Sequence, residues 1–162
     1  MKKLLLLVAA VLCFSAASAQ KGQMAAGVNL DLGFGYPGSY SNIGIGAKFQ
    51  YSFTDHIRIE PAFTYYLKKD LISMWDLMAN VHYVFPMANN KLNLYPLAGL
   101  GVLGVKFGEG EYSASTTNFG VNLGGGVEYK VSKKIAVGAE IKYLIVSNYG
   151  HLGLQIGATY LF

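Results

Sequence analysis

Bulky apolar side chains alternate with small or polar ones, at a spacing of two residues, through most of this chain. In the first such stretch, Val28, Leu30 and Leu32 alternate with Asn29 and Asp31. Successive side chains of a β-strand point to opposite faces, so this alternation predicts strands with one apolar face. It predicts eight strands, at 24–34, 43–53, 57–67, 74–85, 92–106, 119–129, 135–147 and 152–162.

The segments between these strands are short, which favours antiparallel neighbours joined by hairpins. One end of the sheet carries the tight turns, near 54–55, 86–90 and 131–134, and we call it the turn end. The other end, the loop end, carries the connections near 35–40, 68–72, 108–117 and 148–150. The chain therefore predicts an all-β, up-and-down antiparallel fold.

The composition indicates that this sheet lies in a membrane. Hydrophobic residues make up 52% of the chain and charged residues only 14%, where about 25% charged residues is usual. Beyond the first residues, the longest run of apolar residues and glycine is 97–105, about half of the roughly 20 residues that a spanning helix needs. A closed β-barrel is the remaining way to cross a bilayer.

The first residues, MKKLLLLVAAVLCFSAASAQ, have the features of a cleavable signal peptide. Two lysines precede an apolar run, and Ala17-Ser18-Ala19 fits the cleavage pattern. We therefore expect a signal peptide at 1–19 and one barrel domain at 20–162. Cleavage would remove Cys13 and reduce the formal net charge from +4 to +2, which is too small to indicate nucleic-acid binding.

The two faces of the predicted strands differ in volume, and this sets their direction. An eight-stranded barrel has an interior just wide enough to be filled by side chains, so we expect the bulky face outside. A soluble barrel of the lipocalin type would place its apolar face inside. Aromatic residues gather near both strand ends, as expected for membrane-interface girdles: Phe53, Phe85, Tyr129, Tyr160 and Phe162 at one end, and Phe34, Tyr65, Trp75 and Phe119 at the other.

Charges of both signs fall on the predicted inner face. An unpaired charge in a narrow, poorly hydrated interior is strongly disfavoured, so we expect these charges to pair across the lumen and to fill it. A small pore is the alternative. The predicted interior charge network is Asp31, Lys48, Arg58, Glu60, Glu128, Glu140 and Lys142.

The last strand carries Gly157, Tyr160 and the terminal Phe162. This pattern resembles the C-terminal signal of Gram-negative outer-membrane barrels, and the resemblance implies recognition by the barrel-assembly machinery. Together with the signal peptide and eight alternating strands, the chain resembles small outer-membrane barrels of the OmpX type and the OmpA transmembrane domain.

The resemblance implies a monomer in the outer membrane of a Gram-negative bacterium, with a structural or interaction role in the cell envelope. The implied partners are outer-membrane lipids, lipopolysaccharide and, through the outer loops, host or cell-surface ligands. The even strand count predicts that both mature termini are periplasmic.

Some barrels of this class modify lipid A, and two of their patterns can be compared with the chain. The deacylase type carries His-x-Ser-Asn, but here Ile145 stands where the histidine would precede Ser147. The palmitoyltransferase type needs His, Asp and Ser at the outer rim, and Asp76, Ser147 and His151 lack a diagnostic spacing. A lipid A enzyme is therefore a less favoured alternative, and we expect no catalytic, cofactor or metal site.

Overall fold

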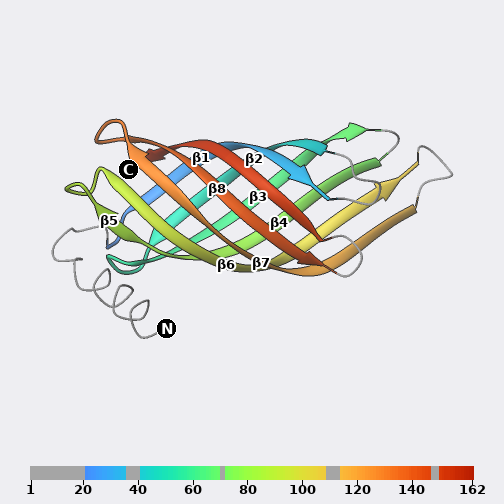
Figure 1. Ribbon diagram of the computed structural model, residues 1–162, viewed down its shortest axis with the longest axis horizontal. Helices are drawn as coiled ribbons and strands as arrows, with labels where there is room; N and C mark the ends of the chain where they lie inside the picture. Colours follow the sequence, from blue (N-terminus) through green and yellow to red (C-terminus); the bar gives the residue numbers. More distant parts are fainter. Residues whose placement is uncertain (1–20, 36–40, 70–71, 109–113, 147–149) are drawn as a thin grey trace, which may run out of the picture.

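The computed structural model describes residues 21–35, 41–69, 72–108, 114–146 and 150–162. These residues form one antiparallel sheet that is closed into a barrel (Figure 1). No helix among them is long and apolar enough to cross a membrane. The strands are β1 Met24–Phe34, β2 Ser41–Ser52, β3 Ile57–Lys69, β4 Ile72–Tyr83, β5 Phe85–Met87, β6 Leu92–Phe107, β7 Ala114–Lys130, β8 Ile135–Val146 and β9 His151–Leu161.

The barrel closes through the pairing of β1 with β9, and β4 pairs with β6 on the other side. Both β4 and the short β5 pair with β6, so they form one wall strand interrupted at Val84. At this point the Val84 N–H donates to the carbonyl of His56 (2.6 Å), and His56 Nδ1 donates to the Val84 carbonyl (3.0 Å). The predicted eight-stranded up-and-down barrel is confirmed.

Several strands are longer at the loop end than the sequence predicted. The largest difference is β7, which begins at Ala114, whereas the pattern predicted a strand from 119 and a loop over 108–117. Its ladder with β6 continues to the Phe107–Ala114 pair. Residues 115–118 are polar, so the apolar alternation stops before the backbone pairing does, and the prediction of a loop at 114–117 was wrong.

The two faces of the wall have the directions that their volumes predicted. Outward side chains such as Val28 and Ile156 remain 63% and 61% exposed, whereas their inward neighbours Asn29 and Gln155 are buried. A surface of this kind is suited to hydrocarbon, because the apolar side chains face it and the backbone groups pair within the wall. The strands thus hold their polar side chains inside the barrel.

The volumes of the two faces predicted an interior of small and polar side chains only. The structure differs from this prediction, because bulky apolar side chains also lie inside. Toward the loop end it contains an apolar cluster from β3, β4, β6 and β8: Tyr66, Met74, Met78, Leu103, Val105, Leu144 and Val146. Leu103 and Val105 lie in the run 97–105, where both faces are apolar and the alternation gives no direction. The lumen therefore has a polar middle and an apolar region above it.

Candidate functional site: the lumen

In the middle of the lumen, one lysine lies between two glutamates that come from different strands. Lys48 on β2 places its Nζ 3.2 Å from Glu60 Oε2 on β3 and 3.0 Å from Glu140 Oε1 on β8. The Tyr95 hydroxyl donates to Glu140 Oε1 (2.8 Å), and Gln50 Nε2 donates to Glu60 Oε2 (2.7 Å). Each carboxylate is thus held by the lysine and by one neutral donor.

A second pair lies toward the turn end. Arg58 Nη1 on β3 lies 3.1 Å from Glu128 Oε2 and 3.2 Å from Oε1 on β7, on the opposite wall. Asn93 Nδ2 donates to the same carboxylate (3.0 Å), and the guanidinium lies 4.8 Å from the centroid of the Tyr95 ring. The His82 ring stacks on the same tyrosine, with the two ring centroids 4.6 Å apart.

A third group lies toward the loop end. Lys142 Nζ on β8 lies 3.3 Å from Asp31 Oδ1 on β1. Asn29 Nδ2 donates to the other oxygen of Asp31, and Lys142 also donates to Gln155 Oε1. All the residues of the predicted interior network therefore lie on the inner face. The first two groups are linked through Gln50, which donates to Glu60 and accepts from Arg58 Nη1 at its Oε1 (3.2 Å).

The charges of these groups do not balance. Among the described residues, the buried carboxylates outnumber the cationic side chains that face them, by five to three. The carboxylates are Asp31, Glu60, Asp76, Glu128 and Glu140, and the cations are Lys48, Arg58 and Lys142; Lys130 is half-buried at the turn end. The Arg58–Glu128 and Lys142–Asp31 pairs each combine one cation with one carboxylate, so the excess carboxylates are one of the two glutamates at Lys48 and Asp76.

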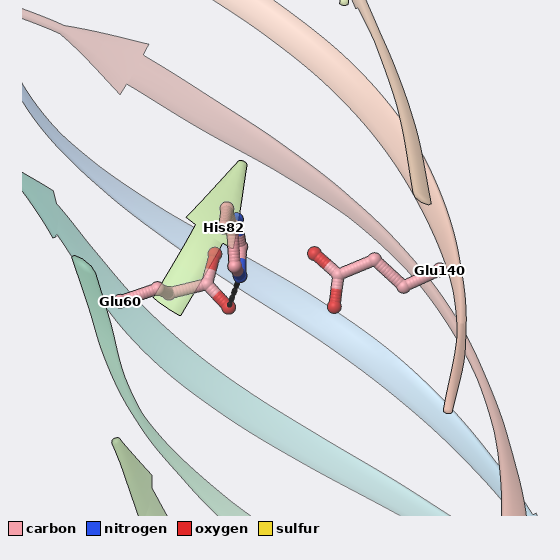
Figure 2. A group of neighbouring side chains, drawn as sticks. All are labelled: Glu60, His82 and Glu140. Atoms are coloured by element: carbon pink, nitrogen blue, oxygen red, sulfur yellow. Dashed lines mark ion pairs between the residues drawn. The ribbon is translucent and has the colours of Figure 1, made fainter. Parts of the chain in front are cut away.

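Three side chains that could each offer one ligand atom to a metal ion face one another next to Lys48 (Figure 2). Glu60, His82 and Glu140 come from three strands and point toward one place in the lumen, with potential ligand atoms within 4.8 Å of one another. Glu60 Oε1, His82 Nε2 and Glu140 Oε2 are buried and make no hydrogen bond within the described part of the chain. This is the group of side chains to test as a metal site.

The neighbours of this group do not suit a metal ion. Arg58 Nε and Nη2 lie 3.3 and 3.1 Å from His82 Nδ1, and a guanidinium can only donate. A neutral His82 therefore carries its proton on Nε2, the atom that lies 3.7 Å from Glu60 Oε1, whereas a metal ligand needs a lone pair there. One N–H donor and two carboxylate acceptors match the hydrogen-bonding capacity of a water molecule instead.

Two of the residues that were weighed for lipid A chemistry, Asp76 and His151, lie inside the wall. Asp76 and His151 are both 4% exposed and line one small cavity with Tyr66, whose hydroxyl donates to Asp76 Oδ2 (3.0 Å). Ser147 lies outside the described residues. Since lipid surrounds the barrel, a substrate in the membrane has no direct contact with these two side chains.

Of the residues of the predicted assembly signal, Gly157 lies within β9, Tyr160 lies near its end and Phe162 follows it. Tyr160 and Phe162 are 47% and 62% exposed, and their ring centroids are 6.3 Å apart. Phe162 also lies 6.3 Å from Phe49 on β2. At Gly157, a Cβ would lie 2.8 Å from the Val28 carbonyl, so β1 and β9 approach closely there.

Sequence reasoning missed some polar residues of the lumen. Gln50, Asn93 and Tyr95 provide hydrogen bonds to the buried carboxylates. Their parity could have revealed them. Gln50 lies two residues from the predicted inner position Lys48, and Asn93 and Tyr95 alternate with the apolar Leu92 and Leu94.

The chain shares its fold with solved outer-membrane barrels. The barrel of Neisserial surface protein A matches with a TM-score of 0.71 and 18% identity, covering 86% of this chain and 96% of that one. The N-terminal β-barrel domain of Pseudomonas aeruginosa OprF matches with a TM-score of 0.68 and 16% identity, covering 88% and 98%. These identities support the likeness of fold alone.

A third similar structure is the attachment invasion locus protein Ail of Yersinia pestis, in complex with the heparin analogue sucrose octasulfate. It matches with a TM-score of 0.59 and 21% identity, covering 88% of this chain and all of that one. No curated protein matches the sequence. A family model described as the outer membrane protein beta-barrel domain matches residues 4–162, nearly the whole chain, and the chain therefore belongs to this family of outer-membrane barrels.

Proposed function

We propose that this protein is a barrel with a filled lumen, which serves the outer membrane as a structural or ligand-presenting component and not as a conduit. The main support for this proposal is that side chains from strands that are not neighbours in the sheet meet at hydrogen-bond distance across the lumen. Lys48 on β2 contacts Glu140 on β8, and Asn122 Nδ2 on β7 donates to Asn80 Oδ1 on β4 (3.0 Å). A continuous water path would require such contacts to separate.

The region toward the loop end supports the same proposal. There the apolar cluster around Leu103 and Tyr66 continues the filling above the charged groups. The cavity between Asp76 and His151 has a volume of about 10 Å³, which is at most the space of one water molecule. An ion that crossed this level would lose its hydration without gaining a complete set of ligands.

Conductance measurements test this proposal against the alternative of a small pore. Purified protein is added to a planar lipid bilayer at physiological salt, with a known porin as a positive control for insertion and detection. Folding and insertion of the protein are verified in vesicles of the same lipid. A filled lumen predicts no stable current steps, and regular single-channel steps from the unmutated protein would contradict it.

The proposal includes the topology. Signal-peptide cleavage after Ala19 would leave a barrel at 20–162 with both termini in the periplasm and the loop end outside the cell. An epitope inserted after Ser132, at the turn end, should be reached by antibody only after the outer membrane is permeabilised. An epitope between Glu111 and Ser113, which lies outside the described residues, should be reached on intact cells; the opposite labelling would contradict the topology.

Outer loops are the surface through which such a barrel would meet ligands. The complex of Ail with a heparin analogue shows that a protein of this fold can bind a sulfated sugar. For this chain we propose contacts with host or cell-surface ligands through the segments near 36–40 and 109–113. Whole-cell binding to immobilised ligands, before and after deletion of 109–113, tests this role, and unchanged binding would exclude that loop. We assign no enzymatic step to the barrel.

A further inference from the structure

Basic residues gather at one part of the turn end. Lys91, Lys133 and Lys134 are exposed, and Lys130 is half-buried beside them. We call these four residues the basic sector. Within the described part of the turn end, the acidic residues are Asp55, whose Oδ1 accepts from the backbone N–H of Lys21 (3.2 Å), and Glu128, which is buried against Arg58. No acidic side chain among the described residues is exposed next to the basic sector, and its lysines outnumber the single α-carboxylate of Phe162, which follows the end of β9.

Backbone hydrogen bonds hold the lysines of the basic sector on adjacent strand ends (Figure 1, the end with the C label). The Lys130 N–H donates to the carbonyl of Lys91 (2.8 Å), and the Leu161 N–H donates to that of Lys134 (2.8 Å). The turn between β7 and β8 is closed by Ser132 Oγ, which accepts from the N–H groups of Lys134 (3.2 Å) and Ile135 (3.1 Å). The backbone segments that carry these lysines are therefore held near one another by the fold.

The position of Lys134 relates the basic sector to the membrane surface. Its Nζ lies 5.9 Å from the centroid of the Tyr160 ring, which faces outward from the wall. Tyr129, at the end of β7, also faces outward and is 47% exposed. Outward tyrosines at strand ends mark the level of the lipid headgroups. The ammonium of Lys134, next to Tyr160, therefore lies at the level of the lipid phosphates.

We propose that the basic sector binds the headgroups of anionic phospholipids, such as phosphatidylglycerol, in the leaflet at the turn end. A soluble acidic partner would approach the lysines from the aqueous side of the turn end. The ammonium of Lys134 instead lies beside an outward tyrosine, on the side that faces lipid. Clustered lysines at a membrane surface attract anionic lipids, and each contributes separately. That this leaflet is the periplasmic one rests on the proposed topology, whereas binding of the lipid does not.

Native mass spectrometry of the purified barrel tests this directly. The protein is equilibrated in detergent with equimolar phosphatidylethanolamine and phosphatidylglycerol, and the ratio of the two retained lipids is measured. The unmutated protein should prefer phosphatidylglycerol, and the preference should fall at high salt. The variant Lys91→Gln/Lys133→Gln/Lys134→Gln should lose roughly fivefold in preference for each lysine removed.

Two control variants make the result specific. Lys106→Gln removes an exposed lysine near the loop end and should leave the preference at the turn end unchanged. The corresponding triple replacement by arginine should keep it. Folding of each variant is verified by its heat-dependent gel mobility, and Lys134→Gln alone replaces the triple variant if that does not fold.

Equal retention of the two lipids by the unmutated protein would overturn the proposal. An unchanged ratio in the Gln variant, or an equal loss in Lys106→Gln, would overturn it as well. Conductance of the barrel, which would refute the filled lumen, does not affect this measurement, so the two failures are distinguishable.

Discussion

Removal of the positive charge at Lys48 should destabilise the barrel more than removal of the negative charge at Glu140. Lys48 neutralises two carboxylates at 3.2 and 3.0 Å, so Lys48→Met leaves both Glu60 and Glu140 in the lumen without their cation. Breaking a buried ion pair by removing one partner costs about 3–5 kcal/mol. We expect a loss at the upper end of this range, because two carboxylates lose their partner.

Glu140→Gln has a smaller expected cost, although it acts on the same ion pair. The amide oxygen introduced by this substitution can still accept from Tyr95, whose hydroxyl lies 2.8 Å from the carboxylate oxygen in the unmutated protein. Lys48 keeps its contact with Glu60, and one excess negative charge disappears from the group. What remains is the weakening of hydrogen bonds to a charged group, about 1.5–3 kcal/mol at most.

Urea unfolding in lipid vesicles, followed by the fluorescence of the single Trp75, measures both values. This tryptophan lies on β4 against Phe63, at 6.3 Å between ring centroids. It alternates with the buried Met74 and Asp76, so it faces outward, whereas both mutated side chains face the lumen. The double variant Lys48→Met/Glu140→Gln should be more stable than Lys48→Met alone, because it removes one of the two uncompensated carboxylates. If Glu140→Gln costs as much as Lys48→Met, the charge imbalance in the lumen does not control stability.

Two further predictions concern the wall and its assembly. At Gly124 a Cβ would lie 2.2 Å from the backbone carbonyl of Ile141, whereas at Gly153 the nearest atom is 3.4 Å away. Gly124→Ala should therefore cost about 1–3 kcal/mol in unfolding free energy, while Gly153→Ala should cost less than half as much, and equal losses would argue against the close approach. Deletion of Phe162, which is 62% exposed, should lower the amount of folded protein in the outer membrane of cells severalfold. Its effect on the free energy of unfolding in vesicles should be less than about 2 kcal/mol. Normal insertion in cells would show that Phe162 is not an assembly signal.

The fold could be predicted from the sequence because the two faces of each strand differ strongly. A pair such as Val28 and Asn29 has one sensible arrangement in a narrow barrel in lipid, and a register shift by one residue would reverse it. The strand ends at the loop end could not be predicted, since at 115–118 both faces are polar and only backbone pairing continues the strand.

The charged residues of the lumen were predictable from the sequence, but their contacts were not. Parity places Lys48 and Glu140 inside, but their meeting depends on the stagger of β2 relative to β8 and on the rotamers of two long side chains. The role of His82 was also hidden, because its tautomer is determined by Arg58, whose approach the sequence does not reveal. The apolar cluster was missed because Leu103 lies in a run without alternation.

The closure of the wall between β1 and β9 has a consequence for how long the protein survives. Separation of these strands would leave the facing N–H and C=O groups of Ala25–Phe34 and Leu152–Leu161 in hydrocarbon, where each unsatisfied group costs several kcal/mol. The sum is far beyond any thermal fluctuation, so the wall cannot fray open at one seam as the end of a soluble sheet does. Loss of the protein from the membrane is then an all-or-none event limited by a kinetic barrier, and the whole barrel must be extracted before a protease can reach the backbone of its strands.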